Sequence, residues 1–355
     1  METLHLETLH REISAAIASL DFDRIFPGFR PLKFALYNDT ECFFDGRYIE
    51  KTVDFCANTA IPFKGETIAI WYVAEEMPIA VFASKLVHEM FHGFQNVQGW
   101  NCPVDEMDAL YRYAYDAGNL SRKLNENKLL TELLNGFDEW KYRALMQSRK
   151  YRSERFPYEF MYESCVEEIE GSANYVEWQV LKQLDPAQAE LLERKMRQTV
   201  VCPESFFPIR RASYFTGALL IHAMCAAGEY PFAPARRPVI LPALERLPSL
   251  EASPVDPAIC GKVDRALSAF LRESERIVRT AVEENDVVLT GPRELVTVNV
   301  YDARCFAGHL TSRFFVMYLE DGAQKLLQGN FVVQMRDAKT IEKVFRWNER
   351  EEKSK

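Results

Sequence analysis

Two histidines and a glutamate fall within five residues, in His88-Glu89-Met90-Phe91-His92. Apolar residues recur at helical spacing over residues 79–94, so His88 and His92, four positions apart, share one helix face. Two imidazoles placed in this way can reach one ion, each nitrogen about 2.0–2.1 Å from it. Glu89 projects beside that face, where it can act on a water molecule without binding the metal. The pattern predicts that His88 and His92 bind zinc and that Glu89 is the general base of a hydrolysis.

The competing interpretation is a chance occurrence of this pattern on a surface helix. The chain has only six histidines, and two of them fall here. The helix is apolar around His88, Glu89 and His92, so burying them without a metal would be costly. A predicted strand at residues 66–73 precedes the helix, as in zinc-dependent hydrolases. These features favour the metal site.

A catalytic zinc site needs a third protein ligand and one open position. The search leads to residues 163–177, where polar side chains recur at helical spacing: Glu163, Glu167, Glu170, Asn174 and Glu177. Such a face is either a solvated acidic stripe or one that a cation makes tolerable. Because a histidine pair is predicted nearby, the second interpretation is favoured.

The segment Glu170-Gly171-Ser172-Ala173-Asn174-Tyr175-Val176-Glu177 resembles the E-G-x-A-x-Y-x-E segment of the gluzincin clan of zinc peptidases, in its aminopeptidase and leukotriene hydrolase branch and bacterial relatives. The resemblance implies that Glu170 is the third zinc ligand and that Gly171 permits close helix packing. The clan also has a tyrosine in a Y-x-x-G segment that donates to the oxyanion. Tyr214-Phe215-Thr216-Gly217 is similar, so the resemblance assigns that role to Tyr214.

The chain departs from the aminopeptidases in two ways. His92 and Glu170 are 78 positions apart, so residues 96–155 are an insertion relative to that branch. No G-x-M-E-N segment, which grips a free amino terminus, precedes the helix, so aminopeptidase activity is not implied. The insertion carries acidic residues that form either a wall of the cleft or a solvated face: Asp105, Glu106 and Asp108.

The predicted function is that of a zinc-dependent metallopeptidase that acts on a peptide or protein substrate. Zinc would activate a water molecule, Glu89 would take its proton, and Tyr214 would stabilise the oxyanion. One alternative is a zincin-like binding or regulatory module with little catalysis. The other is a metal hydrolase of a non-peptide substrate.

Further polar residues receive less specific predictions. Glu167 and Asn174, one turn either side of Glu170, are candidates to orient the histidines through hydrogen bonds. His222 is expected to be a core histidine rather than part of the site. Arg210 and Arg211 either bind a substrate carboxylate or are ordinary surface arginines.

Composition limits the remaining function classes. The net charge of -9 over 355 residues argues against a nucleic-acid partner. No window supplies the roughly 18 uncharged apolar residues of a membrane span, and charged residues interrupt the first twenty, so neither membrane nor secretion is expected. The eight scattered cysteines are expected to be reduced thiols in a cytoplasmic protein. The sequence does not indicate an oligomeric state.

The order of apolar patterns predicts an α+β, zincin-like protein. Residues 1–102 are expected to form a first helix, a small antiparallel β-sheet with strands at 32–37, 42–48 and 66–73, and the histidine helix. Residues 103–286 form a mostly helical lobe that carries Glu170, with a proline-rich linker at 231–257. Residues 287–355 form a small C-terminal β-sheet domain with strands at 294–302, 312–319, 326–335 and 341–347.

Overall fold

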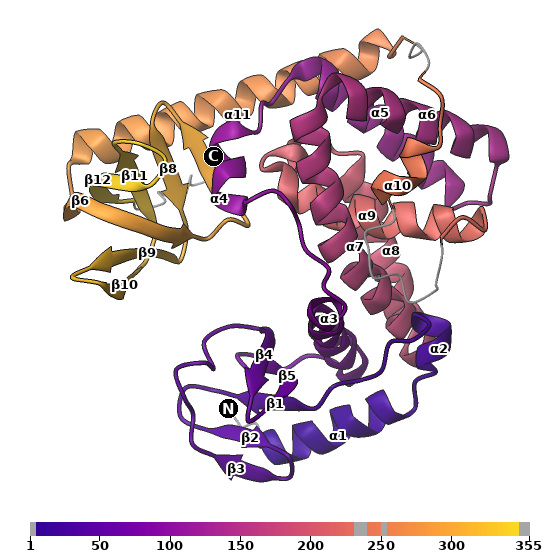
Figure 1. Ribbon diagram of the computed structural model, residues 1–355, viewed down its shortest axis with the longest axis vertical. Helices are drawn as coiled ribbons and strands as arrows, with labels where there is room; N and C mark the ends of the chain where they lie inside the picture. The colour runs from indigo at the N-terminus through magenta and orange to yellow at the C-terminus, as the bar shows by residue number, and fades with distance from the viewer. Residues whose placement is uncertain (1–4, 231–239, 250–253, 348–355) are drawn as a thin grey trace, which may run out of the picture.

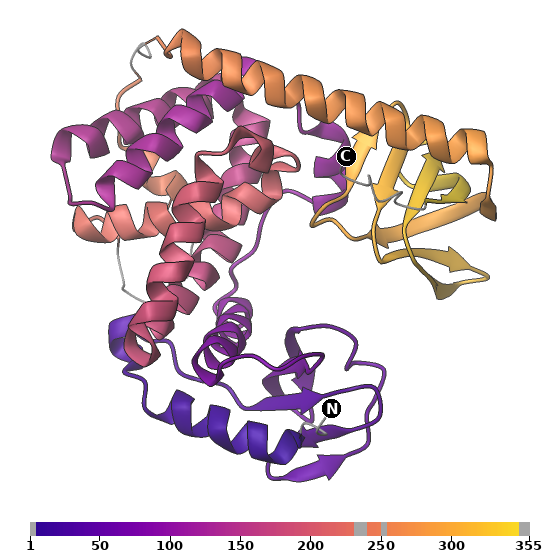
Figure 2. The same cartoon turned by 180° about the vertical axis from the view of Figure 1, so that it is seen from behind.

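The computed structural model describes residues 5–230, 240–249 and 254–347. The chain is α+β, with an N-terminal sheet, a helical middle region and a C-terminal sheet. The ribbon curves into a C in the two opposite views of Figures 1 and 2, with a sheet at each end and the helical region between them. The predicted order of the three regions is therefore confirmed.

The N-terminal region contains a five-stranded sheet of order β3-β2-β1-β5-β4, which α1 and α3 (Ile79–Val97) contact. The elements are α1 (Leu6–Ala18), α2 (Phe22–Ile25), β1 (Phe34–Tyr37), β2 (Cys42–Phe44), β3 (Arg47–Ile49), β4 (Thr59–Phe63) and β5 (Glu66–Tyr72). The prediction of a purely antiparallel sheet is wrong, because β1 and β5 run parallel. The hairpin β2–β3 occupies one side of β1, and the chain returns on the other side in the same direction.

Two further details of this sheet differ from the prediction. The run 42–48 is two strands rather than one, because Asp45 and Gly46 both have positive φ and form the tight turn of a hairpin. The edge strand β4 was not predicted. Its Pro62 obscures the strand pattern, although proline is tolerated at a sheet edge.

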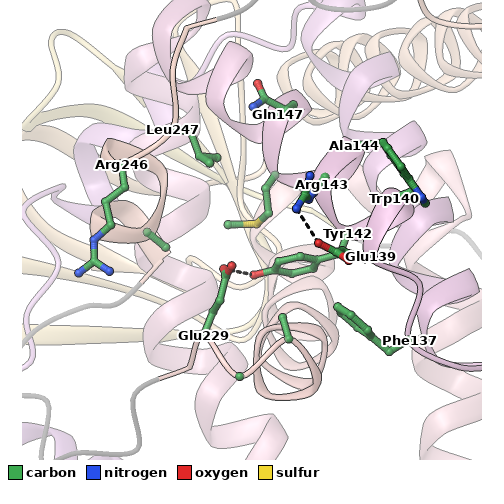
Figure 3. A pocket seen from close by; sticks show the side chains of 14 residues that line it. Phe137, Glu139, Trp140, Tyr142, Arg143, Ala144, Gln147, Glu229, Arg246 and Leu247 are labelled. Carbon is green, nitrogen blue, oxygen red and sulfur yellow. Dashed lines mark hydrogen bonds and ion pairs between the residues drawn. The ribbon is translucent and has the colours of Figure 1, made fainter.

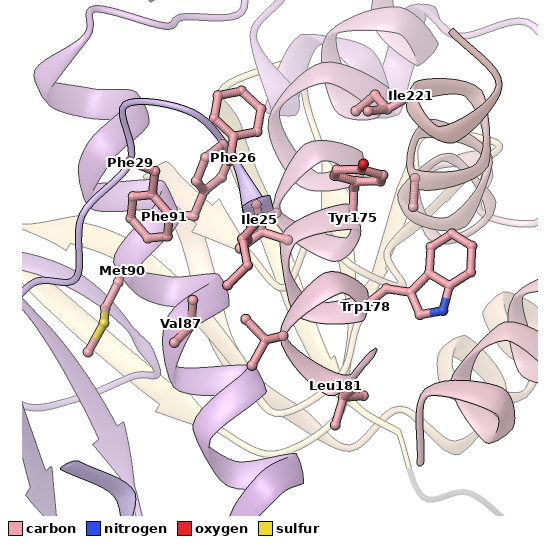
Figure 4. Packing of buried hydrophobic residues seen from close by; sticks show 14 of the residues in the cluster. Ile25, Phe26, Phe29, Val87, Met90, Phe91, Tyr175, Trp178, Leu181 and Ile221 are labelled. Atoms are coloured by element: carbon pink, nitrogen blue, oxygen red, sulfur yellow. The ribbon is translucent and has the colours of Figure 1, made fainter. Parts of the chain in front are cut away.

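Helix α3 (Ile79–Val97) carries both histidines and lies between the N-terminal sheet and α7 (Figure 1). Gly93 permits close contact with the sheet side, since a Cβ there would lie 2.5 Å from Cδ1 of Leu32. Val87, Met90 and Phe91 point into the main core, where they meet residues of α2, the following loop and α7 (Figure 4). Burial of this apolar face fixes the rotation of α3 and hence the direction of its histidines.

The helical region begins with three helices over residues 106–155. Its elements are α4 (Glu106–Arg112), α5 (Ala117–Leu133), α6 (Glu139–Arg155), α7 (Pro157–Leu184), α8 (Pro186–Val200), the 3-10 helix η1 (Pro203–Phe206), α9 (Ile209–Ala226), α10 (Ile240–Glu245) and α11 (Pro257–Glu284). Pro157 opens α7, and Asp185 caps α8 by accepting from two backbone N–H groups.

Helix α9 begins at Ile209, directly after Pro208, and α11 begins at Pro257. Asp256 caps α11 through the backbone N–H of Ala258, a local signal that apolar periodicity does not contain. The proline-rich stretch contains α10. Its residues 231–239 and 250–253 lie outside the described residues.

The C-terminal region is a seven-stranded antiparallel sheet of order β10-β9-β6-β12-β11-β8-β7. Its strands are β6 (Val287–Val298), β7 (Arg304–Phe306), β8 (His309–Ser312), β9 (Phe315–Glu320), β10 (Ala323–Gln328), β11 (Phe331–Met335) and β12 (Thr340–Arg346). The predicted single strand at 326–335 is wrong. Gly329, at φ +131°, turns the chain from β10, at the sheet edge beside β9, to β11, between β8 and β12.

Two helices join this sheet to the helical region. Helix α11 contacts α5 and η1 along one part and β7, β11 and β12 along another. Met107, Leu110 and Tyr111 of α4 pack against the core of the sheet. None of the helices that the structure describes has the length and apolar character needed to cross a membrane.

Candidate metal centre

Three donor atoms from two helices converge at the centre of the molecule. Nε2 of His88 and Nε2 of His92 are 3.1 Å apart, and Oε2 of Glu170 lies 3.9 Å and 3.3 Å from them. The three side chains are 11–19% exposed, so water can reach them. The structure therefore brings together the residues that the sequence singled out as ligands, although they lie 78 positions apart.

The spacing of these atoms fits a small divalent ion. Donor atoms 2.0–2.1 Å from a tetrahedral zinc lie about 3.3 Å from one another, and the measured separations of 3.1–3.9 Å lie around this value. Two imidazoles and a carboxylate also form a common donor set for catalytic zinc. His88, His92 and Glu170 could thus hold a metal ion.

The protonation of the ligands follows from their mutual contacts. Burial alone would raise the pKa of Glu170, but His92 and Arg210 lower it to about 2, so this group is a carboxylate. Burial alone would lower the pKa of His92, but the hydrogen bond and charge of Glu170 raise it to about 9. In the metal-free protein His92 and Glu170 therefore form an ion pair, and a cation would replace the proton on Nε2 of His92.

Each ligating histidine is oriented through its other ring nitrogen. Nδ1 of His92 lies 2.8 Å from Oε1 of Gln95, whose amide group donates to the carbonyl of Ile169 and the hydroxyl of Ser172 on α7. Nδ1 of His88 lies 3.4 Å from Oε2 of Glu177. These contacts leave both Nε2 atoms facing Glu170.

These partners correct the predicted ones. Gln95 and Glu177 orient the histidines, whereas the sequence suggested Glu167 and Asn174. Glu167 is fully buried in a separate ion-pair network with Lys123 and Arg149. A sequence signal for Glu177 existed, since it lies two helical turns after Glu170 on the same face.

Glu89 directly follows His88 in the sequence, and the charges of both His88 and His92 act on its carboxyl group. Burial raises its pKa above the ordinary value, and the charges of Glu170 and Glu177 act in the same direction, against those of His88 and His92. A carboxylate of raised pKa beside the donor atoms is a better proton acceptor than an exposed glutamate.

The two glycines of the short motifs touch each other where α7 crosses α9. A Cβ on Gly171 would lie 2.5 Å from the Cα of Gly217, and one on Gly217 would lie 2.3 Å from the carbonyl oxygen of Glu167. Only glycine at both positions permits this approach. The crossing brings Tyr214, one turn before Gly217, next to Glu170.

Tyr214 remains protonated in this setting. Burial and the neighbouring Glu170 raise its pKa above the ordinary value, and a hydrogen bond joins its hydroxyl to Glu170. Nη2 of Arg210 lies 3.3 Å from the same hydroxyl. Tyr214 is thus a hydrogen-bond donor at the edge of the ligand group.

Arg210 also belongs to the site, unlike an ordinary surface arginine. Its side chain is only 12% exposed and its Nη2 lies 2.9 Å from Oε1 of Glu170. Its Nη1 forms an ion pair with Glu106 of α4. Arg211 instead lies over the ring of Tyr301. The sequence did not distinguish the two, although Arg210 lies one helical turn before Tyr214.

His222 lies outside the ligand group, as predicted. Its ring packs edge-on against Trp178 at 5.2 Å, and burial lowers its pKa to about 4. It is a neutral core histidine.

A separate cavity lies away from the three donor atoms. It measures about 950 Å³ and lies along α6, the end of α9 and α10 (Figure 3). Its described lining includes Trp140, Tyr142, which bonds Glu229, and Arg143, which bonds Glu139. His88, His92 and Glu170 are not among its lining residues, so this cavity is distinct from the candidate metal centre.

Comparison of the chain with protein-family models, with curated proteins and with solved structures gave no match.

Proposed function

We propose that the chain is a zinc-dependent hydrolase with a zincin-like, gluzincin-type catalytic region, and that it cleaves peptide bonds. One observation carries the proposal: Nε2 of His88, Nε2 of His92 and Oε2 of Glu170 converge at separations suited to a tetrahedral ion. The motif resemblance around Glu170 and Tyr214 supports a peptide rather than another substrate.

The roles of the side chains follow from their positions. His88, His92 and Glu170 would hold the zinc ion, which would supply Lewis acidity and lower the pKa of a bound water molecule to near 7. Glu89, whose pKa is raised by burial, accepts that proton and passes it to the leaving amine. Tyr214 keeps its proton and donates a hydrogen bond to the oxyanion, once its bond to Glu170 is exchanged for one to substrate.

The test has two parts, metal content and peptide cleavage. Purified protein should contain zinc near one equivalent, and a peptide-library digest should show cleavage that a chelator abolishes and zinc restores. Glu89→Gln should retain the metal and lose turnover, because only the proton acceptor changes. Glu170→Ala should release the metal.

Each alternative has its own result. Zinc binding without cleavage of any peptide favours a binding module or a non-peptide substrate. If the wild type binds no zinc, or if Glu89→Gln cleaves the same peptides at the wild-type rate, the proposal is wrong.

A further inference from the structure

We propose that Glu106 and Arg210 form a positioning pair that holds Glu170 in its metal-binding orientation and links it to the C-terminal sheet. The inference rests on the proposed function, because it concerns the third ligand of the same site. Neither residue is a ligand or touches the reacting atoms in this assignment. They act through Glu170.

The first contact fixes the carboxylate of Glu170. Arg210 holds Oε1 at 2.9 Å, while Oε2 faces the histidines. A carboxylate held at one oxygen presents the other in a defined direction, as a ligand that binds through a single oxygen requires. Because the contact is charge-assisted and largely buried, it is stronger than an exposed ion pair.

The second contact concerns charge. A buried guanidinium beside a divalent cation would repel it. Glu106 forms an ion pair with Nη1 of Arg210, so the arginine approaches Glu170 with its charge offset. Tyr162 of α7 donates to the other oxygen of Glu106 at 2.8 Å and keeps that carboxylate in place.

The third observation is the position of Glu106 in the fold. It is the first residue of α4, which Asp105 caps through the N–H of Asp108. The next residue, Met107, packs with Leu110 and Tyr111 on the core of the C-terminal sheet. A chain of contacts therefore runs from that sheet through Glu106 and Arg210 to Glu170.

The experiment measures zinc affinity by competition with a chromophoric chelator. Glu106→Gln removes the charge that offsets Arg210 but keeps the shape of the side chain. Loss of such a supporting partner typically weakens metal binding by about 10- to 100-fold, and we expect a change in this range. Arg210→Lys should act in the same direction, since an ammonium group cannot hold two carboxylates as a guanidinium fork does.

Asp108→Asn is the matched control. It removes the same charge from the same helix, but Asp108 is exposed and lies 4.0 Å from Arg112, away from the site. Its zinc affinity should equal that of the wild type. The thermal midpoints of the metal-free proteins separate positioning from folding: affinity should fall in Glu106→Gln and Arg210→Lys while both still melt cooperatively near the wild-type temperature.

Wild-type zinc affinity in both Glu106→Gln and Arg210→Lys would overturn the positioning pair and leave the proposed function intact. If Glu106→Gln does not fold, Arg210→Lys alone decides. If the wild type itself binds no zinc, the proposed function fails first, and the positioning inference fails with it. Equal weakening in Asp108→Asn would assign the effect to overall charge and also overturn the inference.

Discussion

The two metal-facing histidines are held by different kinds of partner. Gln95 on the same helix holds His92 through a neutral amide. Glu177 on α7 faces His88 with a carboxylate that Lys85 also approaches, at 3.5 Å. A carboxylate partner makes an imidazole a stronger donor, so His88 should depend more on its partner's charge than His92 does.

Glu177→Gln tests this difference. The amide keeps the shape of the side chain that lies 3.4 Å from Nδ1 of His88 but no longer offers charge. Zinc affinity, measured by chelator competition, should fall by about 10- to 100-fold. Glu190→Gln, the same change on the exposed side of α8, should leave the affinity unchanged. Equal affinities in wild type and Glu177→Gln would remove Glu177 from the support of the site.

The residues that the structure brings together as a possible metal site could be predicted from sequence, but their supporting residues could not. His88, Glu89 and His92 form a local pattern, and Glu170 lies in a recognisable segment. Arg210 lies 40 positions from Glu170 and 104 from Glu106, so its role arises only where α4, α7 and α9 meet. Glu167 was misassigned because the sequence does not reveal that Lys123 and Arg149 neutralise it.

At the scale of elements, the contact between α7 and α9 fixes the distance from Tyr214 to Glu170. The sequence predicted a mostly helical region here, and the helical spacing of the polar residues over 163–177 already indicated a helix at the place of α7. It did not predict that β1 pairs parallel with β5, because strand pairing depends on which distant segments meet. Local signals thus fix helices better than sheet order.

Gly217→Ala should disrupt the α7–α9 crossing. Its Cβ would meet backbone atoms of Glu167, which cannot move as a flexible side chain can. We expect a loss of about 1–3 kcal/mol in the free energy of unfolding, measured with urea. Gly261→Ala in α11 is the matched control: its nearest atom is the end of Arg265 at 3.5 Å, so the change should stabilise by about 0.5–1 kcal/mol. If Gly217→Ala has the same free energy of unfolding as the wild type, the close crossing of α7 and α9 is contradicted.

A second feature at this scale is the buried ion network that joins α5 and α6 to α7. Lys123 and Arg152 both pair with Glu163, at 2.9 Å and 2.6 Å, and all three side chains are almost fully buried. Burial alone would raise the pKa of Glu163, but Arg152 and Lys123 lower it from 4.5 to about 2. Helices α5 and α6 thus supply the cations that balance this part of α7.

The network predicts acid sensitivity. Because the pKa of Glu163 is lowered in the folded state, its contribution is complete above pH 4.5 and is lost as the pH falls towards 2. This group alone should account for on the order of 3 kcal/mol of the free energy of unfolding. Urea unfolding of the metal-free protein at several pH values measures this pH-dependent part of the free energy of unfolding. Glu163→Gln should be less stable at pH 7 and lose part of the pH dependence; an unchanged dependence would contradict the assignment.

At the scale of the whole molecule, the C-terminal sheet reaches the site from the side opposite the N-terminal sheet. Tyr301, in the turn after β6, meets the ring of Tyr214 edge-on at 5.9 Å. The same residue lies under Arg211. Two parts of the site, the third ligand through Glu106 and the proposed oxyanion donor through Tyr301, therefore contact the C-terminal region or the helix packed on it.

Tyr301→Ala separates these two connections, because it removes the lateral support of Tyr214 and the contact with Arg211 but leaves His88, His92 and Glu170 untouched. An aromatic pair of this geometry contributes about 0.5–1.5 kcal/mol, so kcat/KM on a peptide found in the library digest should fall by roughly 2- to 13-fold. Zinc affinity should stay at the wild-type value. Tyr48→Ala on β3 provides the control, since Tyr48 is equally exposed, at 46%, but lies in the N-terminal sheet. If Tyr301→Ala cleaves as fast as Tyr48→Ala, the C-terminal sheet does not support Tyr214. If Tyr301→Ala binds zinc more weakly than the wild type, Tyr301 acts through the metal ligands instead.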